Sequence, residues 1–153
     1  MKRKCDEWIN VSAFFARNGI DQKYEPSCKY PSFDIPEGLE EIIPNQTVRD
    51  CKVMVAAQYI LIAGPGIYED FIIRPKGSRT GQWGLDKWPL WACKFKEVAE
   101  KGDLSSDVQA AALEARAVMI SLHPDPFATE VPASDTEGDR HSAQCDEREV
   151  AEL

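Results

Sequence analysis

The sequence contains few of the residues from which catalytic and metal sites are built. Its two histidines, His123 and His141, are not accompanied by a Gly-x-Ser-x-Gly or Cys-His signature. The five cysteines are dispersed along the chain without a Cys-x-x-Cys motif, so a local zinc signature is absent. Residues 64–70 lack the lysine and hydroxyl group of a phosphate-binding P-loop. The sequence therefore predicts no catalytic residue, no metal site and no cofactor.

No apolar run is long enough to cross a bilayer. The longest, Val53 to Ala63, is interrupted only by Gln58. As a helix it would rise about 16 Å, whereas a span needs about 20 residues. The basic opening "MKRK" is not followed by the apolar run of a signal peptide. We expect no membrane partner and an intracellular protein, cytoplasmic or nuclear, with reduced thiols.

Acidic residues outnumber basic ones by 26 to 18, so the net charge is -8, with an isoelectric point near 4.8. Nucleic-acid binding is not expected, because phosphate contacts need a basic face. Most of the excess acid lies in residues 124–153, where small polar residues and proline also accumulate. Such a composition cannot bury enough apolar surface to fold. We expect a helical domain over residues 6–123 and a disordered acidic tail over 124–153.

Helical spacing of apolar residues dominates the rest of the chain. A helix over 6–18 places Trp8, Val11, Phe14 and Phe15 on one apolar face. Residues 20–36 contain three prolines and are expected to form a loop, followed by a short helix over 37–43. A central helix over 47–63, apolar all round, is expected to begin at Thr47 and to be ended by Gly64-Pro65-Gly66. Helices over 86–101 and 106–122 complete an all-α bundle of about four to five helices with long loops. The first has Pro89 in its first turn and is ended by Gly102, and the second has one apolar face made of Val108, Ala111, Ala112, Ala115, Met119 and Leu122.

Three segments resemble one family when they are taken in order. They are INVSAFFARNG (9–19), DCKVMVAAQYILIAGPGIYE (50–69) and WPLWACKFKEVAEKGDLSSDVQAAALEARAVM (88–119). Together they resemble the uncharacterised, mainly ascomycete family known as domain of unknown function 3632, over roughly residues 8 to 120. Tyr59 stands where that family usually has tryptophan. The resemblance implies an all-helical fold and a fungal source, and it brings no established activity, cofactor or catalytic residue.

The candidate ligand-binding residues surround the central helix and a basic loop after it. Gln58, Tyr59, Arg17 and Arg74 would supply the polar groups of a pocket, with Trp83 and Trp88 as its aromatic wall. Each has a structural alternative. A buried Gln58 would also be explained by hydrogen bonds within the protein, and Trp88 by packing in the core.

Two functions remain open on this evidence. The first is a helical module that binds a partner protein or another copy of itself. The alternative is a small-molecule-binding protein or enzyme, with its pocket between the central helix and the Trp83 loop. An apolar surface patch on the first helix would favour the first function, and an enclosed cavity reaching Gln58 would favour the second.

Overall fold

The computed structural model describes residues 2–19, 29–69 and 86–130. Within these ranges the chain is all-helical, as expected, and it contains no strand. The helices are α1 (Lys2–Gly19), α2 (Lys29–Leu39), α3 (Gln46–Ile67), α4 (Lys87–Glu100) and α5 (Ser106–Leu122), followed by the 3-10 helix η3 (Asp125–Glu130).

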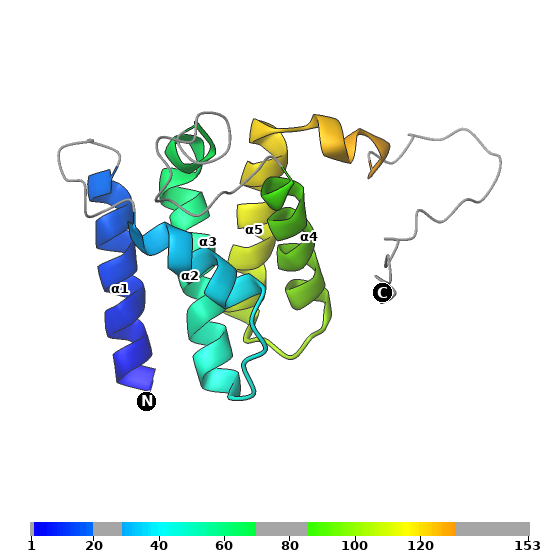
Figure 1. The fold of residues 1–153 in the computed structure, drawn as a ribbon. Coiled ribbons are helices and arrows are strands. Elements are labelled where there is room, and N and C mark those ends of the chain that lie inside the picture. The colour runs from blue at the N-terminus through cyan, green and yellow to red at the C-terminus, as the bar shows by residue number, and fades with distance from the viewer. Residues whose placement is uncertain (1, 20–28, 70–85, 131–153) are drawn as a thin grey trace, which may run out of the picture.

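Helix α3 is the centre of the bundle, and α1, α2 and α5 all pack against it. Figure 1 shows α1, α3 and α5 running in the same direction, with their first residues at one end of the molecule. Helix α2 crosses in front of α3. Helix α4 runs antiparallel to α5 and packs on it. The position of α3 explains its composition, because a helix with neighbours on several sides needs apolar residues all round.

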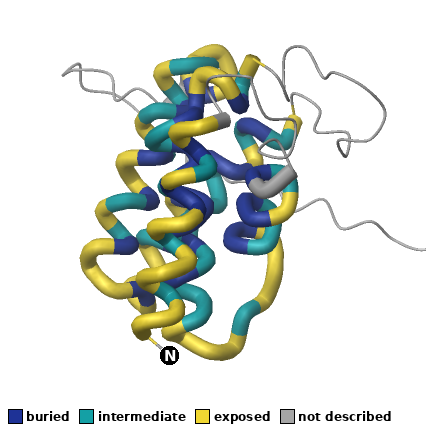
Figure 2. The backbone as a smooth tube through the Cα atoms, turned by 90° about the vertical axis from the view of Figure 1, so that its left-hand side faces the viewer, coloured by how far each residue is buried: buried dark blue, intermediate teal, exposed yellow. Residues whose placement is uncertain are grey.

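The core is built from the inner faces of these helices. Its largest fully buried side chains are Trp88 and Trp91 of α4, Tyr59 of α3 and Phe95 of α4. The α5 residues that were expected to face the core include Val108, Ala112, Ala115 and Met119, and all four are buried. The two alanines among them allow α5 to approach its neighbours closely. Figure 2 shows the buried stretches toward the interior of the bundle and exposed stretches on the side that faces the viewer, where α1 lies.

The expected loop over 20–36 is wrong in its second half, because α2 begins at Lys29 and contains Pro36. Pro31 lies in the first turn, where the missing N–H has no helical partner to lose. Ile35 and Leu39 are buried four residues apart, so packing against α3 offsets the cost of Pro36. The expected helix over 37–43 is correspondingly displaced toward the N-terminus.

Both expected ends of the central helix are also wrong. Asn45 caps it, with its side-chain oxygen accepting from the Val48 N–H at 3.1 Å, so the helix starts before Thr47. Gly64 and Pro65 do not stop the helix, which continues to Ile67. Gly64 is buried beside Val118 of α5, so its absent side chain permits the close contact between the two helices.

The chain is described beyond the expected end of the helical domain at residue 123. In η3, Phe127 is buried, and the Arg116 guanidinium lies 6.0 Å from the centre of its ring. Residues 131–153, the rest of the expected acidic tail, lie outside the described residues. Among the helices that the structure describes, none is long and apolar enough to cross a membrane.

Candidate interaction surface

Helix α1 packs on α3 through its small side chains. Ser12, Ala13 and Ala16 are buried, and Cys5 and Ile9 are partly buried along the same side. Small residues at these positions let the two helix backbones come close together. The large apolar residues that the sequence places on one face of this helix are therefore not the ones that hold it to the bundle.

That apolar face points mainly to solvent. Trp8 is 41% exposed, Val11 43% and Phe14 59%, and the three form a row spaced three residues apart. Phe15 is half-buried beside them, with its ring 5.8 Å from that of Phe14 in an edge-to-face arrangement. We call Trp8, Val11 and Phe14 the α1 row.

Elsewhere in the described ranges, the large exposed apolar side chains occur one to an element. They are Phe33 in α2, Ile42 after it, Leu90 in α4 and Leu113 in α5. Single exposed apolar residues are normal on a soluble surface and carry no functional meaning. Three in one helical row are a different observation, and they make α1 the candidate interaction surface.

The residues proposed for a ligand pocket are placed differently from one another. Tyr59 and Trp88 lie in the core, and the Trp88 indole N–H donates to the Met119 carbonyl oxygen at 3.0 Å. Gln58 is half-buried, and its amide nitrogen lies 3.8 Å from the sulfur of Met54. Arg17 is exposed in the last turn of α1. Arg74 and Trp83 lie outside the described residues, so the ligand-binding role of this set stays a prediction.

A buried carboxyl group, Asp34 of α2, was missed because its segment was expected to be a loop. Asp34 is 7% exposed, and the Tyr59 hydroxyl interacts with its carboxyl group. Burial raises the pKa of Asp34 above its ordinary value of 3.8, and the interaction with Tyr59 partly opposes that rise. The helical spacing of Asp34, Ile35 and Leu39 was the available signal for this site.

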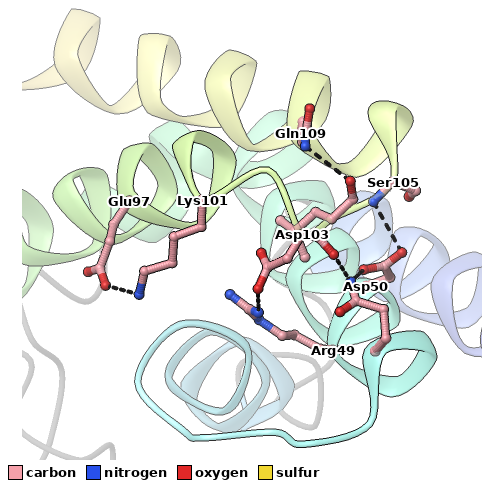
Figure 3. Close-up of polar contacts among 9 residues, drawn as sticks. Arg49, Asp50, Glu97, Lys101, Asp103, Ser105 and Gln109 are labelled. Atoms are coloured by element: carbon pink, nitrogen blue, oxygen red, sulfur yellow. Dashed lines mark hydrogen bonds and ion pairs between the residues drawn. The ribbon is translucent and has the colours of Figure 1, made fainter.

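A polar network fixes the start of α5 on the start of α3 (Figure 3). The Asp50 carboxylate accepts from the Ser105 backbone N–H at 3.3 Å and from the Gln46 amide at 2.8 Å. Arg49 forms an ion pair with Asp103 in the turn between α4 and α5. The backbone N–H of Ser105, the N-cap residue of α5, thus finds its acceptor on another helix, while the Ser105 side chain itself makes no capping bond.

Two surface pockets adjoin these contacts. One of about 330 Å³ lies between the end of α2 and the second half of α4, and its charged lining includes Arg49, Lys94 and Glu97. The other, of about 470 Å³, lies where the first turns of α1, α3 and α5 meet. Gln58, Tyr59 and Trp88 line neither pocket. Over residues 2–19, 29–69 and 86–130, no group of three or more His, Cys, Asp or Glu could hold a metal ion.

Comparisons with known proteins agree with the resemblance seen in the sequence. No curated protein and no solved structure matches the chain. A family model described as "Protein of unknown function (DUF3632)" matches residues 1–95, which include α1, α2, α3 and most of α4. The match therefore contains the α1 row and the Asp34–Tyr59 pair, and the chain belongs to this DUF3632 family.

Proposed function

We propose that this domain is a self-association module, in which the α1 row of one copy packs on the α1 row of a second copy. The observation that carries the proposal is the exposure of Trp8, Val11 and Phe14 on a helix that uses small residues for its own packing. Aromatic side chains in a row are the usual anchors of protein interfaces. A second copy supplies an apolar partner of the same shape, as a two-fold interface requires.

The size of the row supports a weak and reversible dimer. The exposed side-chain surface of the α1 row amounts to roughly 300 Å², if a whole aromatic side chain is taken as about 150–250 Å². A standard interface buries about 800 Å² on each partner, so the row would form the apolar centre and neighbouring polar residues the rim. A dissociation constant in the micromolar range is therefore expected, which corresponds to a binding free energy of about -8 kcal/mol.

The charges of α1 support an antiparallel pairing. Lys2, Arg3 and Lys4 lie at its first turn and are exposed. Parallel copies would bring the two basic clusters together. Antiparallel copies would place each cluster near the last turn of the other helix, where it meets only the single positive charge of Arg17 and where the helix dipole favours positive charge. A crossing near Val11 then brings Trp8 of one copy toward Phe14 of the second copy.

The test is sedimentation equilibrium of the full chain from about 1 to 200 μM, a range chosen to bracket a micromolar constant. We compare wild type with Phe14→Glu and with Leu113→Glu as a matched control. Leu113 is 50% exposed on α5, so the control adds the same charge at a similarly exposed helical position. Substitutions at exposed sites change stability by only about 0.5 kcal/mol, so both variants should fold.

We expect wild type and Leu113→Glu to dimerise alike, and Phe14→Glu to weaken the dimer at least about tenfold, equivalent to 1.4 kcal/mol. Equal weakening by both variants would place the interface elsewhere. A wild-type monomer at every concentration would overturn self-association and leave a different protein as the occupant of the row.

A further inference from the structure

Two thiols lie against each other in the seam between α1 and α3. The Cys51 sulfur donates to the Cys5 carbonyl oxygen at 3.8 Å, and the Cys5 sulfur donates to the Thr47 carbonyl oxygen at 3.9 Å. Each thiol thus reaches the backbone of the opposite helix. Such a mutual approach requires closely packed helices, which the small residues of α1 provide.

The two side chains also interact directly and differ in accessibility. Cys51 is buried, whereas Cys5 is partly exposed and both line the pocket of about 470 Å³. Burial first, and then the hydrogen bond with Cys5, raises the pKa of the Cys51 thiol to about 12. Cys51 therefore keeps its proton at neutral pH, and an oxidant arriving through the pocket meets Cys5 as the accessible sulfur.

We propose that Cys5 and Cys51 are a peroxide-sensitive modification site that closes to a disulfide between α1 and α3. In the first step the Cys5 sulfur attacks one oxygen of hydrogen peroxide. The O–O bond breaks, Cys5 becomes a sulfenic acid, and the released hydroxide takes up the thiol proton as water. In the second step the Cys51 sulfur attacks the Cys5 sulfur while its own proton moves to the departing oxygen, so that no free Cys51 thiolate is needed. The S–O bond breaks, the hydroxide leaves with the Cys51 proton as a second water, and peroxide has oxidised both thiols by two electrons in total.

This site is independent of the proposed self-association. It lies on the inner side of α1, whereas the α1 row lies on the outer side. The disulfide would attach the first turns of α1 covalently to α3, in addition to the packing and the two thiol hydrogen bonds already described. Because a cross-link constrains the unfolded chain, the oxidised protein should melt several degrees higher than the reduced protein.

The test uses the reduced full-length protein treated with a small molar excess of hydrogen peroxide under native conditions. Remaining thiols are alkylated, and non-reducing peptide mapping by mass spectrometry identifies the linked cysteines. Cys93→Ser is the matched control, because Cys93 is also partly exposed but lies on α4. Cys51→Ser removes the second sulfur, and the sulfenic acid on Cys5 is then read by dimedone labelling.

We expect the peptide pair containing Cys5 and Cys51 to exceed every other linked pair at least tenfold, in wild type and in Cys93→Ser. Oxidation in urea should remove that preference, since it depends on the fold. Cys51→Ser should accumulate dimedone-labelled Cys5. The proposal is overturned if Cys51 is alkylated as readily after peroxide as before, or if Cys5 pairs mainly with another cysteine in the folded protein.

Discussion

The carboxyl group of Asp34 in α2 interacts with the Tyr59 hydroxyl in α3, and both side chains are buried. The pair joins two helices at a point where the neighbouring ions, Glu37 and Lys52, form their own ion pair. Asp34 is thus a titratable group placed in the contact between two helices, and its protonation state depends on the fold.

Asp34 should make stability depend on pH in an unusual direction. Its pKa is raised in the folded state, so the folded protein holds this proton more tightly than the unfolded chain. Its contribution is fully present below pH 3.8, the ordinary value, and is lost as pH rises through the raised pKa. We expect the free energy of unfolding of wild type minus that of Asp34→Asn to decrease with rising pH across this window, as urea titrations at several pH values would measure.

Tyr59→Phe provides the counterpart to that experiment. The interaction with the Tyr59 hydroxyl lowers the pKa of Asp34, so removing the hydroxyl should raise that pKa further. The decline in stability should then extend to higher pH than in wild type. A difference between wild type and Asp34→Asn that is constant over pH would contradict the assignment of Asp34.

Glu97 should make stability depend on pH in the opposite direction to Asp34, and only weakly. Hydrogen bonds from Lys101 and Lys94 lower its pKa from 4.5 to about 2, so its contribution is present above pH 4.5 and lost as pH falls toward 2. All three side chains are well exposed, and an exposed network of this kind is worth about 0.5 kcal/mol. Glu97→Gln should lose that amount at pH 7, and about 1 M salt should abolish the difference.

Gly38 should be much less tolerant of a side chain than Gly66. A Cβ atom at Gly38 would lie 2.5 Å from the Lys52 carbonyl oxygen and 3.2 Å from the Ala56 Cβ atom. Gly38→Ala should therefore push α2 away from α3 and cost about 2 kcal/mol. At Gly66 nothing lies within 4 Å, so Gly66→Ala should be neutral or stabilise α3 by up to about 1 kcal/mol. Urea denaturation of the two variants gives the comparison, and equal effects would exclude the close contact as the cause.

Asp50 should stabilise α5 although it belongs to α3. Asp50→Ala removes the acceptor for the N–H of Ser105, the N-cap residue of α5, and should cost about 1 kcal/mol, the usual net value of a hydrogen bond. Asp107→Ala removes an acid from the first turn of α5 itself, where only the dipole interaction of about 0.3–1 kcal/mol is lost. Thermal unfolding in low and high salt separates the two, because screening should reduce the effect of Asp107 far more than that of Asp50.

The sequence was informative where the spacing of apolar residues and the packing agreed. On the expected face of α5, Val108, Ala112, Ala115 and Met119 are buried, and the remaining members, Ala111 and Leu122, are half-buried. In α4, Pro89 lies in the first turn as expected, and Gly102 ends the helix region with a φ of +69°. Local chemistry determines these features, so sequence alone could reveal them.

Long-range packing determined the features that were missed. Pro36 would not lie inside a helix unless burial of Ile35 and Leu39 against α3 offset its cost. Likewise, the large residues of α1 were identified as a face, but only the bundle decides whether large or small residues meet α3. The candidate interaction surface was thus visible as a pattern in the sequence, whereas its exposure was not.

The way α1 is attached has a consequence for the order in which the bundle opens. Helix α1 is held mainly by one neighbour, and it contributes Ser12, Ala13 and Ala16 to the interior where α4 contributes two tryptophans and a phenylalanine. Little apolar surface must therefore be exposed to detach it. Backbone amides in α1 should exchange with deuterium through a local opening, whereas those in the middle of α3 should exchange only through global unfolding. The helix that displays the α1 row would then be the first part of the bundle to detach.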